Sequence, residues 1–362
     1  MTPAKKTAVV LFQLGGPDSL ETIEPFLYNL FMDPDIIDFP GAFLVRRPLA
    51  KFISSRRSVK VAENYKQIGC KSPILDLTQR QASALESMLR SQDMNVHTFI
   101  AMRYLHPMTE EVVKKIKSGG FEQLILLPLY PQFSQATTLS SMNEWNRQAK
   151  KQECTIPAKL ICCYPNQPLF IDAWVENINS ALVRFHKIAS RDIDLIFSAH
   201  GVPLSYIKHG DPYRLQIEET VRCIVERGKW DSPQTLCYQS KVGPTKWLKP
   251  PLIETVTNIA GKGRKYMVVI PIAFVTDHIE TLHEINIDVR RHAMALGVRR
   301  FELTPALNDH PKFIRCLAEL VQAQLASDAQ SHTCKELWQD SIGRPIPTRC
   351  PWSKSQIVKN KF

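Results

Sequence analysis

Four acidic residues in the second half of the chain are spaced three, four and four apart: Asp277, Glu280, Glu284 and Asp288. In an α-helix this spacing places all four carboxylates on one face. Like charges so placed repel, by roughly 0.2–0.5 kcal/mol per pair, so an all-acidic row indicates a nearby cation or protons in transit. The alternative is an ordinary solvated stripe. The row follows an apolar run that ends at Phe274, which favours the functional interpretation.

A histidine, His200, closes the apolar run over 194–200, and Gly201 lets the backbone turn away from it. An imidazole can accept a proton near neutral pH or bind a first-row transition metal. A lone histidine in such a position is more often structural. Together with the acidic row, however, His200 predicts a site that handles protons, a metal ion or both.

No sequence motif supports nucleotide binding, a serine nucleophile or a cysteine-ligated metal site. The chain contains no G-x-G-x-x-G, P-loop or G-x-S-x-G sequence, which argues against a nucleotide site and a serine nucleophile. Its nine cysteines are odd in number and include no C-x-x-C pair. We therefore expect reduced thiols, and neither a tetrahedral zinc site nor an iron–sulfur cluster.

Short apolar runs rich in Val, Ile and Leu are typical of parallel strands covered on both faces. They occupy 7–12, 97–101, 123–129, 159–163, 194–198, 235–238 and 266–274. Helical patterns lie between them, for example over 75–91, 109–118, 170–189 and 215–227. This alternation predicts parallel α/β sheets, whose ligands bind beyond the carboxyl ends of the strands. His200 and the acidic row both follow such ends.

A weak internal repeat divides the chain into halves. Residues 11–17 are similar to 196–203, residues 124–130 are similar to 267–273, and both 102–107 and 239–244 follow a predicted strand. The order is the same in each half. The 362 residues also exceed the usual size of one domain. We therefore expect two similar α/β domains that face each other.

One insertion and the net charge bear on partners and location. Residues 24–58 have no match in the second half and combine apolar clusters with four arginines and Lys51. Such a segment suits a membrane surface or an apolar ligand, or else forms ordinary helices packed on the sheet. The formal charge of +11 favours an anionic partner, but no nucleic-acid motif accompanies it. Without a signal peptide or membrane span, we expect a cytoplasmic protein, with or without peripheral contact at the inner face of the membrane.

Longer segments resemble the signature sequences of ferrochelatases. They are Phe197-Ser-Ala-His-Gly-Val-Pro203, Gly210-Asp-Pro-Tyr213, Gln239-Ser-Lys-Val-Gly-Pro244 with Trp247, and Pro271 to Leu282, together with 14–17, 103–107 and 129–134. They occur in the family's order and cover roughly residues 8 to 320. The resemblance implies two Rossmann-like domains, each a parallel sheet flanked by helices, with a porphyrin in the cleft between them.

By this resemblance, His200 and Glu280 are the catalytic residues that meet the metal and face each other across the macrocycle. His200 would take protons from the pyrrole nitrogens or help to deliver iron, and which residue plays which part stays open. For proton transfer we expect its pKa to lie near neutrality. Asp277, Glu284 and Asp288 would form a path for protons or metal.

The resemblance also implies a set of residues around the substrate. Those expected to contact the macrocycle or its propionates are Arg103, Tyr104, Ser134 and Trp247. Leu14 occupies a position on the opposite porphyrin face where some relatives have methionine, so we expect no sulfur contact to the metal.

Cofactor and domain predictions follow from the same alignment of motifs. Ferrochelatases with a two-iron cluster commonly have a cysteine after the serine of 129–134, where this chain has Gln135, and its tail offers only Cys334 and Cys350. We therefore expect no iron–sulfur cluster and no permanently bound cofactor. The expected domains are 1–165, with a lip near 24–58, and 166–325, which carries His200 and Glu280. Residues 326–362 would form a basic tail, either disordered or in contact with a membrane.

The resemblance implies insertion of ferrous iron into protoporphyrin IX to form protohaem, the last step of haem biosynthesis, and the chemistry of that step favours a distorted macrocycle. One alternative keeps the fold and inserts iron into coproporphyrin or cobalt into a sirohydrochlorin. Another is a two-lobed haem carrier without catalysis. The insertion at 24–58 favours protoporphyrin, and the acidic row argues against a passive carrier.

Overall fold

The structure is a computed structural model that describes residues 5–36, 42–240 and 245–327. The chain forms two compact units. The second unit is the continuous segment Pro165–Phe313. The first unit comprises the described residues up to Tyr164 and those that follow the return of the chain at Ile314. Two chain crossings therefore join the units, one after Tyr164 and one before Ile314.

Four parallel strands form the sheet of the first unit: β1 (Thr7–Gln13), β2 (Val96–Met102), β3 (Gln123–Pro128) and β4 (Ala158–Leu160). Their order is β2-β1-β3-β4, and every residue of β1 is buried. Ala8, Val10 and Phe12 pack in one apolar cluster with α4 (Thr109–Ser118) and α5 (Ser140–Lys151). Because side chains alternate along a strand, Val9 and Leu11 face the opposite layer.

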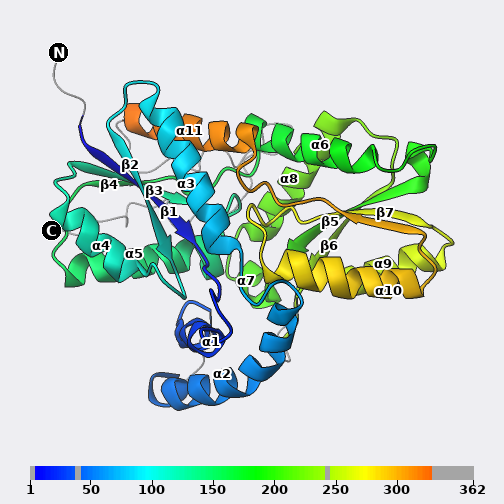
Figure 1. Ribbon diagram of the computed structural model, residues 1–362, viewed down its shortest axis with the longest axis horizontal. Helices are drawn as coiled ribbons and strands as arrows, with labels where there is room; N and C mark the ends of the chain where they lie inside the picture. Colours follow the sequence, from blue (N-terminus) through cyan, green and yellow to red (C-terminus); the bar gives the residue numbers. More distant parts are fainter. Residues whose placement is uncertain (1–4, 37–41, 241–244, 328–362) are drawn as a thin grey trace. The chain divides into compact units, whose positions relative to one another are not determined.

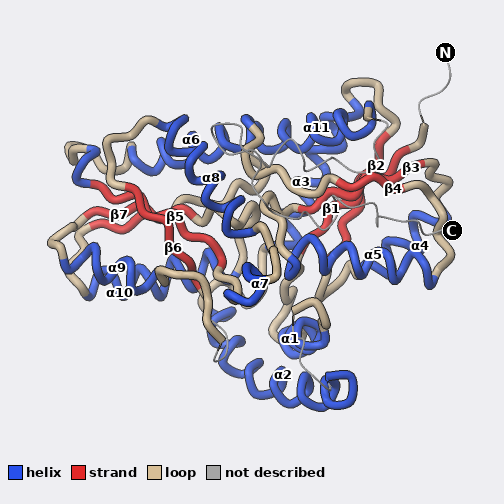
Figure 2. The backbone as a smooth tube through the Cα atoms, turned by 180° about the vertical axis from the view of Figure 1, so that it is seen from behind, coloured by secondary structure: helices blue, strands red, loops and turns tan. Residues whose placement is uncertain are grey.

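Helices cover both faces of this sheet. Figures 1 and 2 show α4 and α5 on one face, and α3 (Ile74–Arg90) and α11 (Pro311–Ala326) on the other. A short π-helix, η1 (Gln135–Leu139), leads from the end of β3 into α5. α1 (Ile23–Met32) and α2 (Ala42–Lys66) pack on each other and stand apart from these two layers (Figure 1).

The second unit has its own four parallel strands: β5 (Ile193–His200), β6 (Gln234–Gln239), β7 (Tyr266–Ile270) and β8 (Arg300–Leu303), in the order β6-β5-β7-β8. One face packs against α9 (Leu252–Gly261), a longer π-helix η3 (Glu280–Val289) and α10 (Arg290–Ala295). α6 (Pro168–Leu182) and α8 (Tyr213–Gly228) cover the other face (Figure 2). Two short helices, η2 (Ser190–Asp192) and α7 (Leu204–Lys208), flank β5 in the chain.

The two sheets have the same topology. In each, the first strand lies between the second and the third, and the fourth extends the edge beside the third. β3 and β7 both lead into a π-helix that continues as an α-helix. This agreement confirms the predicted fold class, an α/β protein of two similar units with parallel sheets flanked by helices.

Several boundaries differ from the sequence prediction for local reasons. β7 ends at Ile270 rather than at 274, because Pro271 has no N–H to continue the ladder. α6 ends at Leu182 rather than at 189, and Lys187 has a left-handed backbone. The apolar-run pattern does not predict β8, because its four residues alternate polar and apolar at a sheet edge.

The unit boundary also differs from the expected 325. The chain re-enters the first unit at Ile314, within α11, which completes a helical layer of the first sheet. The predicted basic tail lies, from residue 328 on, outside the described residues.

The insertion predicted over 24–58 forms α1 and most of α2. α1 packs on the first unit through Phe26, whose ring lies 6.2 Å from that of Tyr104. α2 leaves four apolar side chains exposed, Val45, Leu49, Phe52 and Val59. Over the described part of the chain, no helix combines the length and the apolar character that a membrane crossing requires.

Candidate active site

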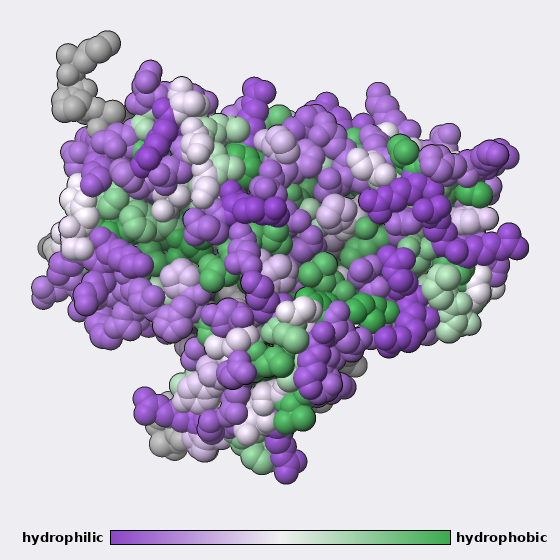
Figure 3. Space-filling model, viewed as in Figure 1, coloured by the Kyte–Doolittle hydropathy of each residue, from purple (hydrophilic) through white to green (hydrophobic). Residues whose placement is uncertain are grey.

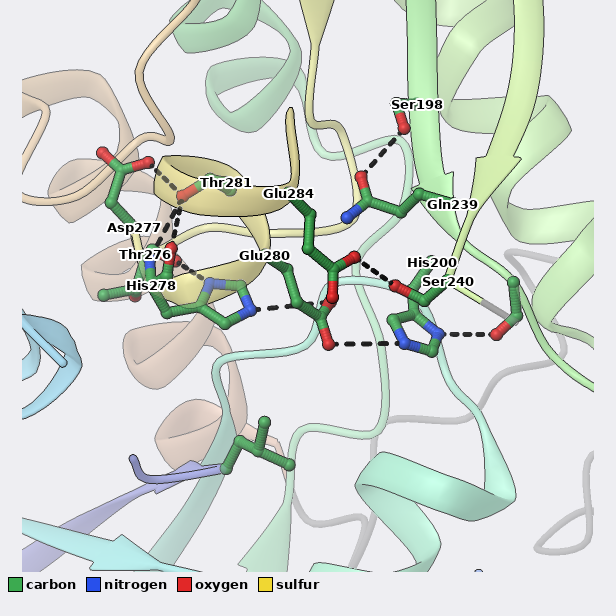
Figure 4. A network of polar contacts seen from close by, with 12 residues as sticks. Ser198, His200, Gln239, Ser240, Thr276, Asp277, His278, Glu280, Thr281 and Glu284 are labelled. Carbon is green, nitrogen blue, oxygen red and sulfur yellow. Dashed lines mark hydrogen bonds and ion pairs between the residues drawn. The ribbon is translucent and has the colours of Figure 1, made fainter. Parts of the chain in front are cut away.

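His200 is the last residue of β5, at the carboxyl edge of the second sheet. The rest of β5 is buried, whereas the His200 side chain is 33% exposed. Its Nδ1–H donates to the Gly201 carbonyl at 2.5 Å, and Nε2 lies 3.5 Å from Glu280 Oε1 (Figure 4). Gly201 has no room for a side chain, since a Cβ there would lie 3.0 Å from the carbonyl oxygens of Gln239 and Ser240.

Aromatic residues surround the His200 ring. The ring of Phe274 lies edge-on at 6.1 Å, and that of Trp247 lies at 6.4 Å, tilted by 60°. The Tyr213 hydroxyl donates to the His200 backbone carbonyl at 3.0 Å. These contacts fix the end of β5 and place the imidazole in a partly apolar setting.

Glu280 is the first residue of η3, and Asp277 anchors the turn before it. One Asp277 carboxylate oxygen accepts from the Thr281 hydroxyl at 2.9 Å and from the Ala306 N–H at 3.2 Å, and the other accepts from the Asn308 amide at 2.8 Å. Asp277 therefore ties the start of the helix to the segment after β8. The segment from Glu280 on is π-helical and not α-helical as predicted, and Asp277, which precedes it, has a structural part at its start.

A second histidine lies on the other side of Glu280. His278 is buried, with Nε2 3.7 Å from Glu280 Oε2 and Nδ1 3.0 Å from the Thr276 carbonyl oxygen. Its ring packs against Phe274, with centroids 4.6 Å apart. Glu280 thus lies between two imidazoles (Figure 4).

The row continues through Glu284 to Asp288. Glu284 Oε2 accepts from the Ser240 hydroxyl at 2.9 Å, at the end of β6. Asp288 lies on the outer part of η3 with its side chain 49% exposed, 3.3 Å from His283 Nδ1 and 3.4 Å from Arg291 Nη1. The carboxylates of Glu280, Glu284 and Asp288 therefore run from the buried site to the surface.

Burial and mutual charge set the protonation of this group. Burial lowers the pKa of His200, but the charge of Glu280 and its hydrogen bond outweigh it and raise that pKa to about 9. Burial by itself raises the pKa of Glu280, but the imidazoles of His200 and His278 outweigh it and hold that pKa well below the usual range. Burial and the charge of Glu280 raise the pKa of Glu284 to about 7. These shifts favour an imidazolium and a carboxylate at His200 and Glu280 at neutral pH, and the pKa closest to neutrality belongs to Glu284 rather than to His200.

In the first unit, Arg103 and Tyr104 follow β2 and are held by Asp33. Arg103 Nη2 lies 2.9 Å from Asp33 Oδ2, and the Tyr104 hydroxyl donates to the same oxygen at 2.6 Å. The Ser140 hydroxyl donates to it at 2.5 Å and accepts from Arg103 Nε at 2.8 Å. All four side chains are buried, so this is a closed network with every charge paired.

Leu14 and Ser134 lie at the carboxyl edge of the same sheet. Leu14 follows β1, and its N–H donates to the Gln13 side-chain oxygen at 2.9 Å. Ser134 is the N-cap of η1, where its hydroxyl oxygen accepts from the Ala136 N–H at 3.3 Å. Both positions agree with the rule that binding residues gather where parallel strands end.

Comparison with known proteins adds the decisive observation. A model of the ferrochelatase family matches residues 6–325. The chain belongs to the ferrochelatase family. The resemblance inferred from its motifs is confirmed.

Curated ferrochelatases match nearly the whole chain. That of Citrifermentans bemidjiense is 43% identical over 320 residues, covering 88% of this chain and 98% of that protein. That of Trichodesmium erythraeum is 42% identical over 327 residues, covering 88% and 83% respectively. Among solved structures, SirB from Bacillus subtilis with Fe3+ has a TM-score of 0.51 at 11% identity, covering 89% of this chain and 96% of that one, which shows the fold alone.

Ferrochelatases are lyases of haem biosynthesis that insert metal into a porphyrin, so this ferrochelatase is an enzyme with iron and a porphyrin as its substrates. Of the residues predicted for its site, the structure brings together His200, Glu280, Glu284 and Trp247 in the second unit. In the first unit it places Arg103, Tyr104, Leu14 and Ser134 at the edge of one sheet.

Sequence reasoning missed Asp33 and His278. Asp33 is 70 residues from Arg103 in the chain, and no pattern links them. His278 lies inside the predicted acidic segment, but a search for carboxylates at helical spacing passes over it. The signal that could have identified His278 is its position, two residues before Glu280 and four residues after the end of the apolar run at Phe274.

Imidazole and carboxylate ligands suit a divalent metal that is held loosely and passed on. Within the ranges that the structure describes, no three His, Cys, Asp or Glu side chains are grouped to hold a metal ion. His200 and Glu280 therefore stand as a pair of donors facing each other.

Proposed function

We propose that this ferrochelatase inserts ferrous iron into protoporphyrin IX to form protohaem, the last step of haem biosynthesis, at His200 and Glu280. One observation carries the proposal: the two side chains face each other, 3.5 Å apart, at the carboxyl edge of the second sheet. The porphyrin loses two N–H protons as it gains one Fe²⁺, so the reaction needs a proton acceptor beside a weak metal ligand. An imidazole paired with a carboxylate supplies both.

The macrocycle must be bent for this exchange. A planar porphyrin holds its lone pairs and two N–H protons in its own plane, where a hydrated ion cannot reach all four nitrogens. A site that binds a saddled macrocycle better than a flat one spends binding energy on this distortion, on the order of a few kcal/mol. The rings of Trp247 and Phe274 beside His200 offer apolar surface for that purpose.

The protonation of the pair determines the order of steps. At neutral pH the raised pKa of His200 keeps its ring protonated, so it cannot yet accept a pyrrole proton. An apolar macrocycle that excludes water favours the neutral pair over the ion pair, because desolvation disfavours charge. The Nε2 proton then moves to Glu280, and the emptied Nε2 accepts a pyrrole proton. Repeated once, this removes both protons as iron enters.

Glu284 and Asp288 carry the protons outward from Glu280. The pKa of Glu284, about 7, lets this carboxylate both accept and release a proton near neutrality. Asp288, half-exposed at the outer end of η3, passes the proton to water. The same oxygens offer a hard-ligand route for iron in the opposite direction.

The first unit supplies the other contacts in this proposal. Leu14 and Ser134 are its proposed contacts to the macrocycle, as Trp247 is in the second unit, and Leu14 brings no sulfur to the metal. Arg103 and Tyr104 serve the propionate side of the substrate indirectly, because both are buried and bound to Asp33. Asp33 holds both in place, since its buried oxygen accepts from each of them.

We further propose peripheral contact of α2 with the inner face of the membrane, in an otherwise cytoplasmic protein. Val45, Leu49, Phe52 and Val59 recur at spacings of four, three and seven, which lines them up on one helix face. All are exposed, and Arg56 stacks on the Phe52 ring at 4.7 Å. Figure 3 shows apolar and polar side chains side by side over α1 and α2. Apolar and basic side chains on one helix suit an anionic lipid surface.

No iron–sulfur cluster belongs to this proposal. Gln135, where cluster-bearing relatives commonly have cysteine, is the first residue of η1. A preparation of the purified chain without porphyrin should contain less than one iron per chain and lack the visible bands of a cluster. A stoichiometric two-iron chromophore would contradict this part.

The function is tested by anaerobic insertion of ferrous iron into protoporphyrin and, separately, coproporphyrin, by the parent and by His200→Ala. Turnover with protoporphyrin that collapses in the variant supports both the substrate and the central residue. A preference for coproporphyrin keeps the chemistry and overturns the substrate. Tight porphyrin binding without insertion overturns the catalytic proposal.

A further inference from the structure

The side-chain amide of Gln239, the last residue of β6, has a partner for its oxygen but none for its NH₂ group among the described residues. Gln239 is 6% exposed, and its Oε1 accepts from the fully buried Ser198 hydroxyl at 2.9 Å. Its Nε2 is buried and has no hydrogen-bond partner among the described residues. A buried donor without a partner is costly, so each one in a folded protein calls for an explanation.

The next residue, Ser240, turns toward the same neighbour. In an extended strand, successive side chains point to opposite faces. Ser240 instead has a left-handed backbone, φ 58°, which a non-glycine residue adopts at some cost. Figure 4 shows the result, with the Gln239 amide and the Ser240 hydroxyl both directed toward the Glu284 side chain.

The two donors differ in their present use. Ser240 Oγ–H donates to Glu284 Oε2 at 2.9 Å, whereas no described residue accepts from Gln239 Nε2–H. A carboxylate has about four acceptor positions, so Glu284 can accept from both residues. Because Ser198 occupies Oε1, the amide is held with its NH₂ end toward the acidic residue, which is also the electrostatically favourable orientation.

We infer that Gln239 is a positioning residue for Glu284: the end of β6 presents two donors, Gln239 Nε2–H and Ser240 Oγ–H, between which the Glu284 carboxylate swings during turnover. The inference rests on the proposed function, in which Glu284 relays protons or metal between Glu280 and Asp288. Ser240 binds the Glu284 carboxylate in its resting position, and Gln239 binds it in the second position. Ser198 acts one step further back, by fixing the amide.

The competing explanation is that Gln239 serves only the fold, through its bond to Ser198. The two explanations differ in what a double variant does. Gln239→Met alone leaves the Ser198 hydroxyl buried without a partner and lowers stability in either case. Ser198→Ala combined with Gln239→Met removes both partners, and replacing a buried hydrogen-bonded pair by apolar groups is close to neutral.

The experiment measures insertion kinetics and thermal unfolding of the full chain for the parent, Gln239→Met, and the Ser198→Ala/Gln239→Met double variant. We expect the double variant to melt within about 3 °C of the parent. Its kcat should fall about tenfold, the effect of one lost hydrogen bond to a charged group. Its KM for porphyrin should stay unchanged, because a buried amide does not touch the macrocycle.

Thr304→Val is the matched control. Thr304 is fully buried in the same unit, and its hydroxyl also lacks a partner among the described residues, but it follows β8 away from His200. We expect parental kcat and an equal or higher melting temperature. A parental kcat in the double variant would overturn the inference. So would a loss of kcat/KM that comes from a higher KM for porphyrin instead of a lower kcat. Failure of the proposed function looks different, since then the parent itself inserts no metal.

Adding Ser240→Ala to Gln239→Met gives a second, independent check. If both donors serve one carboxylate, their effects on kcat are coupled. The fold-loss of kcat in the double variant should then differ by threefold or more from the product of the fold-losses in the two single variants. Strictly multiplicative effects would overturn the two-position mechanism.

Discussion

The two units have the same strand order, and in both a strand is followed by a π-helix and then an α-helix. They differ in the polar residues at the carboxyl edge of the sheet, which form a closed buried network in the first unit and a partly exposed histidine–glutamate pair in the second. In the first unit, Asp33 gathers Arg103, Tyr104 and Ser140 into a buried network in which every group is paired. In the second, Glu280 lies between His200 and His278, and the pKa values are shifted in opposite directions. One scaffold thus supports a fixed charge pair and a group that can exchange protons. The difference is set by the residues after the strands and not by the fold.

The largest effect should follow from removing the central carboxylate of the second unit. Glu280→Gln keeps the shape of the side chain but removes the charge that pairs with His200. We expect the rate of iron insertion to fall about a thousandfold, within the range that general acid–base groups contribute. Steady-state insertion assays measure it, with Glu254→Gln on the exposed face of α9 as the control that keeps parental rates. A loss of less than tenfold would show that Glu280 is not central.

The corresponding change in the first unit should act on stability. Asp33→Asn leaves the Arg103 guanidinium, 9% exposed, without its buried counter-charge. Breaking a buried pair in this way costs about 3 kcal/mol of unfolding free energy. Urea unfolding measures this loss of unfolding free energy. Glu280→Gln disturbs a partly exposed pair, so its loss of unfolding free energy should be clearly smaller. Equal losses in the two variants would remove the distinction between a fixed and an exchangeable network.

A pH series sharpens the comparison at Glu284. Its pKa is raised from 4.5 to about 7, so the neutral carboxyl favours the folded state. That stabilisation is fully present below about pH 4.5 and is lost as the pH rises through about 7. In Glu284→Gln the side chain is neutral at every pH, so the variant does not lose this stabilisation. The melting temperature of the variant relative to the parent should therefore rise between about pH 5 and about pH 8, while that of Glu254→Gln should stay constant.

The smallest expected effect concerns the insertion that only the first unit has. Phe52→Glu on α2 removes an apolar ring that is 55% exposed and adds a negative charge. Binding to vesicles of anionic lipid should weaken about tenfold, from lost apolar burial and charge repulsion. Co-sedimentation measures it. Ile253→Glu, at a 45% exposed apolar position in the second unit, is the control that leaves binding unchanged, and equal weakening by both would exclude a specific role for α2.

Much of this architecture was readable from the chain because its information is local. Apolar runs mark buried parallel strands, and the similarity of 11–17 to 196–203 anticipates that β1 and β5 take the same central place. His200 could be singled out because it closes such a run and the acidic row because it follows another, whereas the choice of Glu280 within that row came from the ferrochelatase resemblance.

What the chain did not reveal depends on tertiary structure. A spacing of four residues fits an α-helix and a π-helix alike, so the acidic row could not identify η3. The Asp33 network joins residues from α1, β2 and α5 segments, and only the fold brings them together. The pKa of His200 depends on how deeply the pair is buried, which residue order does not encode.

The return of the chain at Ile314 has a consequence for synthesis on the ribosome. Proteins usually fold from the N-terminus as they emerge, domain by domain. Here the second unit lies complete between two parts of the first, so its last residue, Phe313, leaves the ribosome before the part of α11 that belongs to the first unit, from Ile314 on. α11 is needed beside β4, where Lys159 Nζ donates to the Gln324 carbonyl at 3.2 Å. The half that begins first in the chain is therefore the half that finishes last.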